Sequence, residues 1–193
     1  MTTSTLRARV IDPGAVFAGW VGLGMALVIV LGLELIVAVQ TLVFVVALPA
    51  GFLVGWYAGV RAERHRPWWR VLLNGIYAGL VTAVGLAILY VGLRLLFFYG
   101  DSGYRDGTQG GPLVCASGPD CTYQRYLAAH QGPLLAAAGV HDAASFEHWF
   151  LRGQLQGGLS LIVLTAGGAL VGAIWFGARP APSGAERRGT ASG

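Results

Sequence analysis

The chain has 193 residues, of which 55% are hydrophobic and only 11% are charged. Soluble domains carry about 25% charged residues, so this composition excludes a soluble globular enzyme, a disordered chain and a nucleic-acid-binding protein. The net charge of +4 comes from thirteen arginines and nine acids, and these are divided by position instead of forming one basic stripe. The sequence predicts a small membrane protein that crosses the bilayer several times.

The first apolar run extends from Ala15 to Val60. A transmembrane helix needs about 20 apolar residues, so this run is long enough for two helices. We expect spans at residues 15–36 and 41–60, joined by a very short turn. Pro49 falls inside the second span and is expected to kink it, because proline lacks a backbone N–H.

A polar cluster at residues 61–70 ends the second span, and a third span is expected at residues 71–99. Residues 100–155 contain no further span, and such a length is typical of a segment with structure of its own. We therefore expect short helices there, outside the bilayer. The fourth span is expected at residues 156–178, and the polar tail 179–193 is expected to be disordered.

The distribution of arginine predicts the orientation. If the spans alternate in direction, residues 1–14, 61–70 and 179–193 share one side of the membrane. That side carries nine arginines and three acids, whereas residues 100–155 carry three arginines and five acids. Arginine-rich loops face the cytoplasm, so we expect a plasma-membrane protein with both termini cytoplasmic. The arginines of the inner loop are expected to contact anionic lipid headgroups: Arg61, Arg64, Arg66 and Arg70.

Cys115 and Cys121 are the only cysteines, and both lie in the segment expected outside the cytoplasm. Because that compartment is oxidising, we expect a disulfide that holds the intervening turn. Two free thiols and a reactive redox pair are the alternatives.

Aromatic residues gather on one side of a helical stretch that begins near Asp142, namely Phe146, Trp149 and Phe150. One interpretation is an amphipathic helix that lies in the membrane interface and leads into the fourth span. The other is that these aromatic residues pack beneath the outer segment. The sequence does not decide between the two.

Three histidines and an acid in the outer segment are metal-ligand types: His130, His141, His148 and Glu147. Their spacing fits no ligand motif, so exposed histidines are the simpler interpretation, and we expect no metal or cofactor. No phosphate-binding loop, nucleophile elbow or zinc-protease motif is present.

Glycine recurs at every fourth position in three of the four expected spans. In lipid, helices associate through close approach over small residues, so these positions predict tight crossings: Gly51, Gly55, Gly59, Gly75, Gly79, Gly168 and Gly172. All lie in the half of their span that is nearer the arginine-rich side, which predicts a bundle that is tighter at its cytoplasmic end. Asn74 is expected to form a hydrogen bond between helices.

Two charged residues, Glu34 and Arg94, fall near the outer ends of the first and third spans. Charges within a membrane are costly and often functional. One interpretation is a structural pair near the interface. The other is a site for a proton or cation, since an acid in the first of four helices resembles the small multidrug transporters. The rest of that pattern is missing here.

These patterns predict an all-α, four-transmembrane-helix bundle with a disulfide-bearing extracytoplasmic segment between its third and fourth helices. We expect a non-enzymatic accessory subunit or scaffold that acts through helix–helix and outer-segment contacts with a protein partner or a second copy. The alternative is a small transporter, or a lipid- or solute-binding protein, that uses an outer-facing cleft near Glu34 and Arg94.

Overall fold

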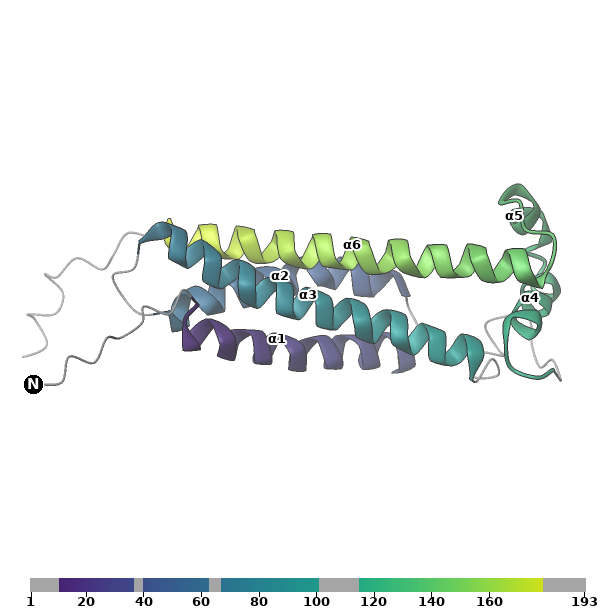
Figure 1. Cartoon of the computed structure of the whole chain (residues 1–193), viewed down its shortest axis with the longest axis horizontal. Helices are drawn as coiled ribbons and strands as arrows, with labels where there is room; N and C mark the ends of the chain where they lie inside the picture. The colour runs from purple at the N-terminus through teal and green to yellow at the C-terminus, as the bar shows by residue number, and fades with distance from the viewer. Residues whose placement is uncertain (1–10, 37–39, 63–66, 101–114, 179–193) are drawn as a thin grey trace, which may run out of the picture.

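The computed structural model describes residues 11–36, 40–62, 67–100 and 115–178. Within these ranges, four long helices form an elongated bundle, and each is long and apolar enough to cross a membrane (Figure 1). They are α1 (Pro13–Leu31) with its π-helical continuation η1 (Gly32–Ile36), α2 (Gln40–Arg61), α3 (Trp68–Tyr99) and α6 (Ala143–Gly177). The predicted fold class, a four-helix transmembrane bundle with a disulfide between its third and fourth spans, is confirmed.

The two ends of the bundle differ in the segments that lie there. The start of α1, the end of α2, the start of α3 and the end of α6 lie together at one end, which we call the terminal end (Figure 1). Two short helices, α4 (Pro119–Ala128) and α5 (Gly132–Ala137), lie beyond the other end. We call residues 115–142, which contain them, the cap.

The cap is carried by two helices only. At about 1.5 Å per residue, α3 is about 48 Å long, whereas α2 is about 33 Å long. Accordingly, α3 and α6 extend past α1 and α2 to reach the cap (Figure 1). A length of about 33 Å matches the hydrocarbon core of a bilayer, and the extra turns of α3 and α6 exceed it.

The N-terminus of α6 is fixed by a capping box, a reciprocal pair of hydrogen bonds between Asp142 and Ser145. The Asp142 carboxylate accepts a hydrogen bond from the Ser145 backbone N–H (2.7 Å), and the Ser145 hydroxyl accepts one from the Asp142 N–H (3.1 Å). This arrangement satisfies backbone donors that a helix otherwise leaves free. The helix then continues unbroken to Gly177, so the helical stretch that begins near Asp142 and the fourth apolar stretch form a single helix.

At the terminal half of the bundle, the backbones of α2 and α6 touch. A Cβ atom added at Gly51 would lie 2.8 Å from the carbonyl carbon of Thr165, and one at Gly55 would lie 2.6 Å from that of Ala169. Backbone atoms cannot move aside as the end of a flexible side chain can. Glycine is therefore required at both positions of α2.

The glycines of α6 and α3 complete this seam. A Cβ at Gly172 would lie 2.9 Å from the backbone nitrogen of Trp56, and Gly168 meets the backbone of α2 in the same way. On α3, a Cβ at Gly75 would lie 2.5 Å from the methyl carbon of Ala173, and one at Gly79 would collide with another alanine methyl of α6. Helix α6 thus packs closely against both α2 and α3.

Nearer the cap, glycines make no comparable contact. A Cβ added at Gly92 of α3 or at Gly153 of α6 would have nothing within 4 Å. At Gly157 it would be in ordinary contact, 3.4 Å from the ring of Tyr90. Close backbone approach between α2 and α6 thus extends from Leu48, near the middle of α2, toward the terminal end.

The apolar core consists of three successive clusters. The terminal-end cluster contains Ala18, Val54, Ala58 and Ala78. The middle cluster contains Ala26, Val30, Val43, Ala47, Leu86, Tyr90 and Leu161. The cap cluster contains Phe98, Leu135, Val140 and Phe146.

The aromatic residues at the start of α6 pack beneath the cap. Phe146 is fully buried, and the rings of Phe150 and Phe98 stack with centroids 4.1 Å apart and planes 9° apart. The second interpretation of this aromatic stretch is the one that the structure shows. The end of α3 therefore packs against α6 and the cap through Phe98.

Some predictions concern residues outside the described ranges. These are the first ten residues, Arg64 and Arg66, residues 101–114 and the tail 179–193. For the described helices, α2 agrees closely with the predicted span 41–60, and α3 begins at Trp68. The helix α2 continues through Pro49.

Candidate functional site

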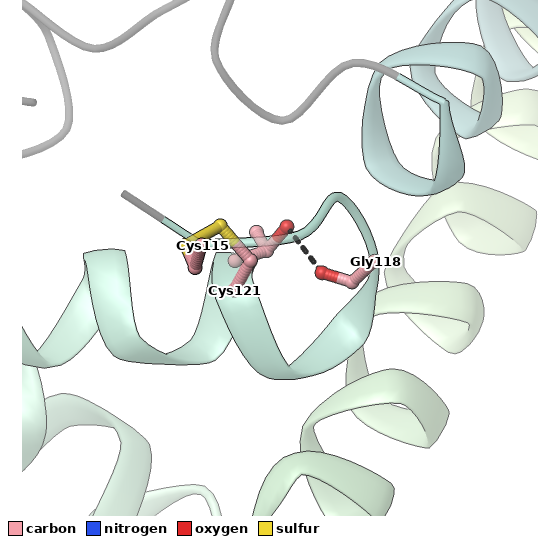
Figure 2. Close-up of a disulfide and its surroundings, with 4 residues drawn as sticks. Cys115, Gly118 and Cys121 are labelled. Carbon is pink, nitrogen blue, oxygen red and sulfur yellow. Dashed lines mark hydrogen bonds between the residues drawn. A yellow bond between two sulfur atoms is a disulfide. The ribbon is translucent and has the colours of Figure 1, made fainter. Parts of the chain in front are cut away.

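The cysteines form the predicted disulfide at the entrance to α4 (Figure 2). The Cα atoms of Cys115 and Cys121 are 5.5 Å apart. Between them, Gly118 has a φ of +135°, which side chains of L residues rarely allow, and its carbonyl accepts a hydrogen bond from the Thr122 hydroxyl (3.1 Å, Figure 2). The disulfide and this glycine together fix the turn from which α4 begins.

Hydrogen bonds and rings attach the cap to both of its supporting helices. The Tyr123 hydroxyl donates to the His141 carbonyl oxygen (3.1 Å), and the rings of Tyr126 and Phe146 meet edge to face at 5.0 Å. At the end of α3, the Tyr99 hydroxyl donates to the Glu147 carboxylate of α6. The cap is therefore fixed to the bundle at several points.

The three histidines do not form a metal site with Glu147. His130, His141 and His148 are all exposed, and Glu147 is engaged with the end of α3. His130 has a φ of 57°, so it belongs to the turn that follows α4. Across the four described ranges, no three His, Cys, Asp or Glu side chains come together in a way that could hold a metal ion.

The structure brings Glu34 and Arg94 together. The distance from Arg94 Nε to Glu34 Oε2 is 3.4 Å, and the two side chains are 14% and 2% exposed. The Arg94 guanidinium carbon also lies 5.1 Å from the centre of the Tyr90 ring, within the range of a cation–π contact. The pair thus joins the first and third spans inside the bundle.

A local change in helix type accompanies the buried acid. Glu34 lies in η1, where the helix widens from α to π geometry. Such single turns occur often at functional positions. Leu31 before the π turn and Ile36 at its end are exposed, whereas Glu34 is buried. The charged group therefore faces the third span and not lipid.

A third polar side chain, Gln154, lies at the same level and is 92% buried. On α6, it is one turn from Phe150, which stacks on Phe98 of α3. It is also one turn from Gly158, at which a Cβ would lie 3.2 Å from Val91 of α3. On α3, Arg94 lies about midway between the two contacting residues, Val91 and Phe98. We call Glu34, Tyr90, Arg94 and Gln154 the polar layer.

The polar layer lies between two apolar clusters. Tyr90 belongs to the middle cluster, and the Phe98–Phe150 stack covers the opposite side. In such surroundings, electrostatic interactions are stronger than in water and unpaired polar groups are costly. This makes the layer the most chemically distinctive site of the bundle.

The sequence did not reveal Gln154, because the fourth span was expected to begin at residue 156. A signal was present in the spacing. Gln154, Gly158, Leu161 and Thr165 recur at intervals of three and four residues, and all four are buried on one face of α6. Extending the helical period backward from Gly158 would have placed Gln154 inside the bundle.

A second polar contact closes the terminal end. The Asp12 backbone N–H donates to Asn74 Oδ1 (3.1 Å), and the Asn74 amide donates to Asp12 Oδ2 (3.0 Å). Both residues are almost fully buried. The interhelical role expected of Asn74 is thus observed, while its partner was not identified from the sequence.

The described arginines at the terminal end lie on aromatic rings. Arg61 donates from Nε to the Tyr57 hydroxyl (2.9 Å), and its guanidinium carbon lies 5.5 Å from the centre of the Phe17 ring. The Arg70 guanidinium carbon lies 5.2 Å from the centre of the Trp69 ring. Aromatic rings beside basic residues are typical of membrane interfaces.

Comparison with models of protein families, with curated proteins and with solved structures finds no match for this chain. The class of protein therefore comes from the chain's own features. Its composition and its four apolar helices define a multi-pass, all-helical membrane protein with one disulfide in the described residues.

Proposed function

We propose that this protein is a non-enzymatic accessory subunit or scaffold of the plasma membrane that holds its cap outside the cell for contact with a protein partner or a second copy. The observation that carries this proposal is that α3 and α6 run unbroken from the terminal end to the cap, where Phe98 and Phe146 pack against Leu135 of the cap. A cap on two unbroken helices is fixed relative to the spans. A contact made by the cap is therefore transmitted to the membrane bundle.

The exposed surface of the cap supports a contact role. Helix α5 contains no charged residue. Leu134 on this helix is 57% exposed, and Leu127 at the end of α4 is 37% exposed. An exposed leucine on an uncharged helix suits an apolar contact with a protein.

The arginines support the proposed orientation. Arg61 and Arg70 lie at the terminal end, together with the ends of the chain's first and last spans. With both termini in the cytoplasm, these guanidinium groups would lie at the level of the inner headgroups. Stacking on Tyr57 and Trp69 leaves their charge available to anionic lipid.

The state of the ion pair favours this function over the alternative of transport at Glu34 and Arg94. The two side chains engage each other, and Glu34 is almost fully buried. The Phe98–Phe150 stack lies between them and the cap. Transport would require this stack and the ion pair to open in every cycle.

Gentle detergent extraction followed by native mass measurement tests the proposal. We expect a complex of defined stoichiometry that is lost in Leu134→Glu, because a charge on α5 would oppose an apolar contact. Gln124→Glu is the matched control, since Gln124 is an exposed residue of α4 outside this apolar surface. A strict monomer in mild detergent, unchanged by either substitution, would contradict the proposal.

A further inference from the structure

The buried polar atoms of the polar layer that have no hydrogen-bond partner among the described residues include Nη2 of Arg94 and Oε1 of Gln154. Gln154 as a whole is 8% exposed. A buried donor or acceptor left without a partner carries its full desolvation cost, so two such atoms at one level point to a bound group.

The chemistry of the two atoms restricts what this group is. A guanidinium N–H only donates, and an amide oxygen only accepts. A group that serves both must accept a hydrogen bond from Arg94 and donate one to Gln154. An anion without a proton offers nothing to Gln154, and a cation is repelled by Arg94, whereas a hydroxyl oxygen does both.

We propose that the polar layer binds a hydroxyl oxygen between Arg94 Nη2 and Gln154 Oε1. Its source is either a water molecule or the hydroxyl group of a lipid headgroup. The layer lies level with the ends of the two shorter helices, Ile36 of η1 and Gln40 of α2. The headgroup region of a bilayer, which holds both sources, begins about where the hydrocarbon core of about 30 Å ends. The bound oxygen joins α3 to α6, and the ion pair extends the connection to η1.

Gln154→Met in the full-length protein, with its disulfide intact, tests the proposal. Methionine has a similar length and needs no hydrogen bond. If the hydroxyl is bound, we expect the unfolding temperature to fall by about 2–4 °C, the shift that corresponds to one ordinary hydrogen bond in a chain of this size. An unchanged or higher unfolding temperature would overturn the proposal, because removing an unbonded acceptor is neutral or stabilising. The control is Gln156→Met at an exposed position of the same helix.

A second variant tests whether Arg94 is the other partner. Arg94→Lys keeps a positive charge opposite Glu34 and removes Nη2. In this background, we expect the effect of Gln154→Met to fall to less than half of its value in the original protein. Equal effects in the two backgrounds would show that the two residues share no ligand.

The lipid composition distinguishes the two sources. The same variants are compared in nanodiscs of phosphatidylcholine alone, with added phosphatidylglycerol, and with added phosphatidylserine. A Gln154→Met effect in phosphatidylcholine alone identifies water. An effect that appears only with phosphatidylglycerol, whose headgroup carries hydroxyls, identifies the lipid. An effect that appears equally with both anionic lipids and not with phosphatidylcholine would overturn the proposal, since it would follow charge and not a hydroxyl.

Discussion

At the terminal end, α2 and α6 meet through glycines whose backbones touch, whereas toward the cap the helices meet through charged, amide and aromatic side chains. A Cβ at Gly55 would lie 2.6 Å from a carbonyl carbon, but one at Gly92 would have nothing within 4 Å. At the terminal end, the packing of α2 against α6 thus depends on glycines that have no side chain at the contact. The end near the cap is specified by contacts between large polar and aromatic side chains, so the two ends should respond differently to substitution.

The largest expected effect is at the polar layer. Glu34→Gln removes the charge opposite Arg94 and leaves a largely buried guanidinium uncompensated. Breaking a buried ion pair costs about 3–5 kcal/mol, and we expect a loss of this order in unfolding titrations in mixed detergent micelles.

The charge-swapped double variant, Glu34→Arg with Arg94→Glu, is the control. It should recover part of the lost stability, because it restores the opposite charges in the same place. Wild-type stability in Glu34→Gln would contradict a structural role for the pair.

The next effect concerns the glycine seam. Gly55→Ala adds one methyl group against the backbone of α6, and overpacking of this kind costs about 1–3 kcal/mol. Gly92→Ala adds the same group where space is open, and we expect it to stabilise the helix by about 0.5–1 kcal/mol. Opposite signs in thermal unfolding would establish the difference between the two ends, and equal effects would contradict it.

The disulfide should matter less, and only locally. Replacing both Cys115 and Cys121 by serine opens a short loop, for which the expected loss is about 2 kcal/mol. Hydrogen exchange should become faster in α4 while exchange in α2 and α6 stays unchanged. Faster exchange throughout the spans would show that the cap and the bundle fold as one unit.

The smallest effect is a pH dependence at the start of α6. Hydrogen bonds from the side chain and backbone of Ser145 lower the pKa of Asp142. Because the folded pKa is below the unfolded one, the stabilisation is present above about pH 4 and is lost as the pH falls below it. Amide exchange in the first turn of α6 should therefore accelerate at low pH, and Asp142→Asn should remove this dependence.

The sequence predicted those features of the fold that depend on the residues of one helix at a time. Length and hydropathy placed α2 to within a residue or so at each end, and the recurrence of glycine identified the seam through Gly51 and Gly168. These features depend on the chain's own period and on the thickness of a bilayer. They do not require knowledge of which helix lies beside which.

The rest depends on pairing between distant residues. Glu34 and Arg94 could be placed at similar depth from the sequence, but the level of Gln154 follows from the antiparallel register of α3 and α6. The early start of α6 depends on the hydrogen bonds between Asp142 and Ser145. The burial of Phe146 depends on a cap whose position the sequence alone does not give.

The most direct test of the proposed membrane arrangement is the accessibility of three protease-cleavable tags in intact cells. The tags are placed at the N-terminus, at the C-terminus and after Gly110, between α3 and the disulfide. We expect external protease to cut only the tag after Gly110, because four spans leave both termini inside and the cap outside. Cleavage of either terminal tag in intact cells, or protection of the tag after Gly110, would contradict the arrangement.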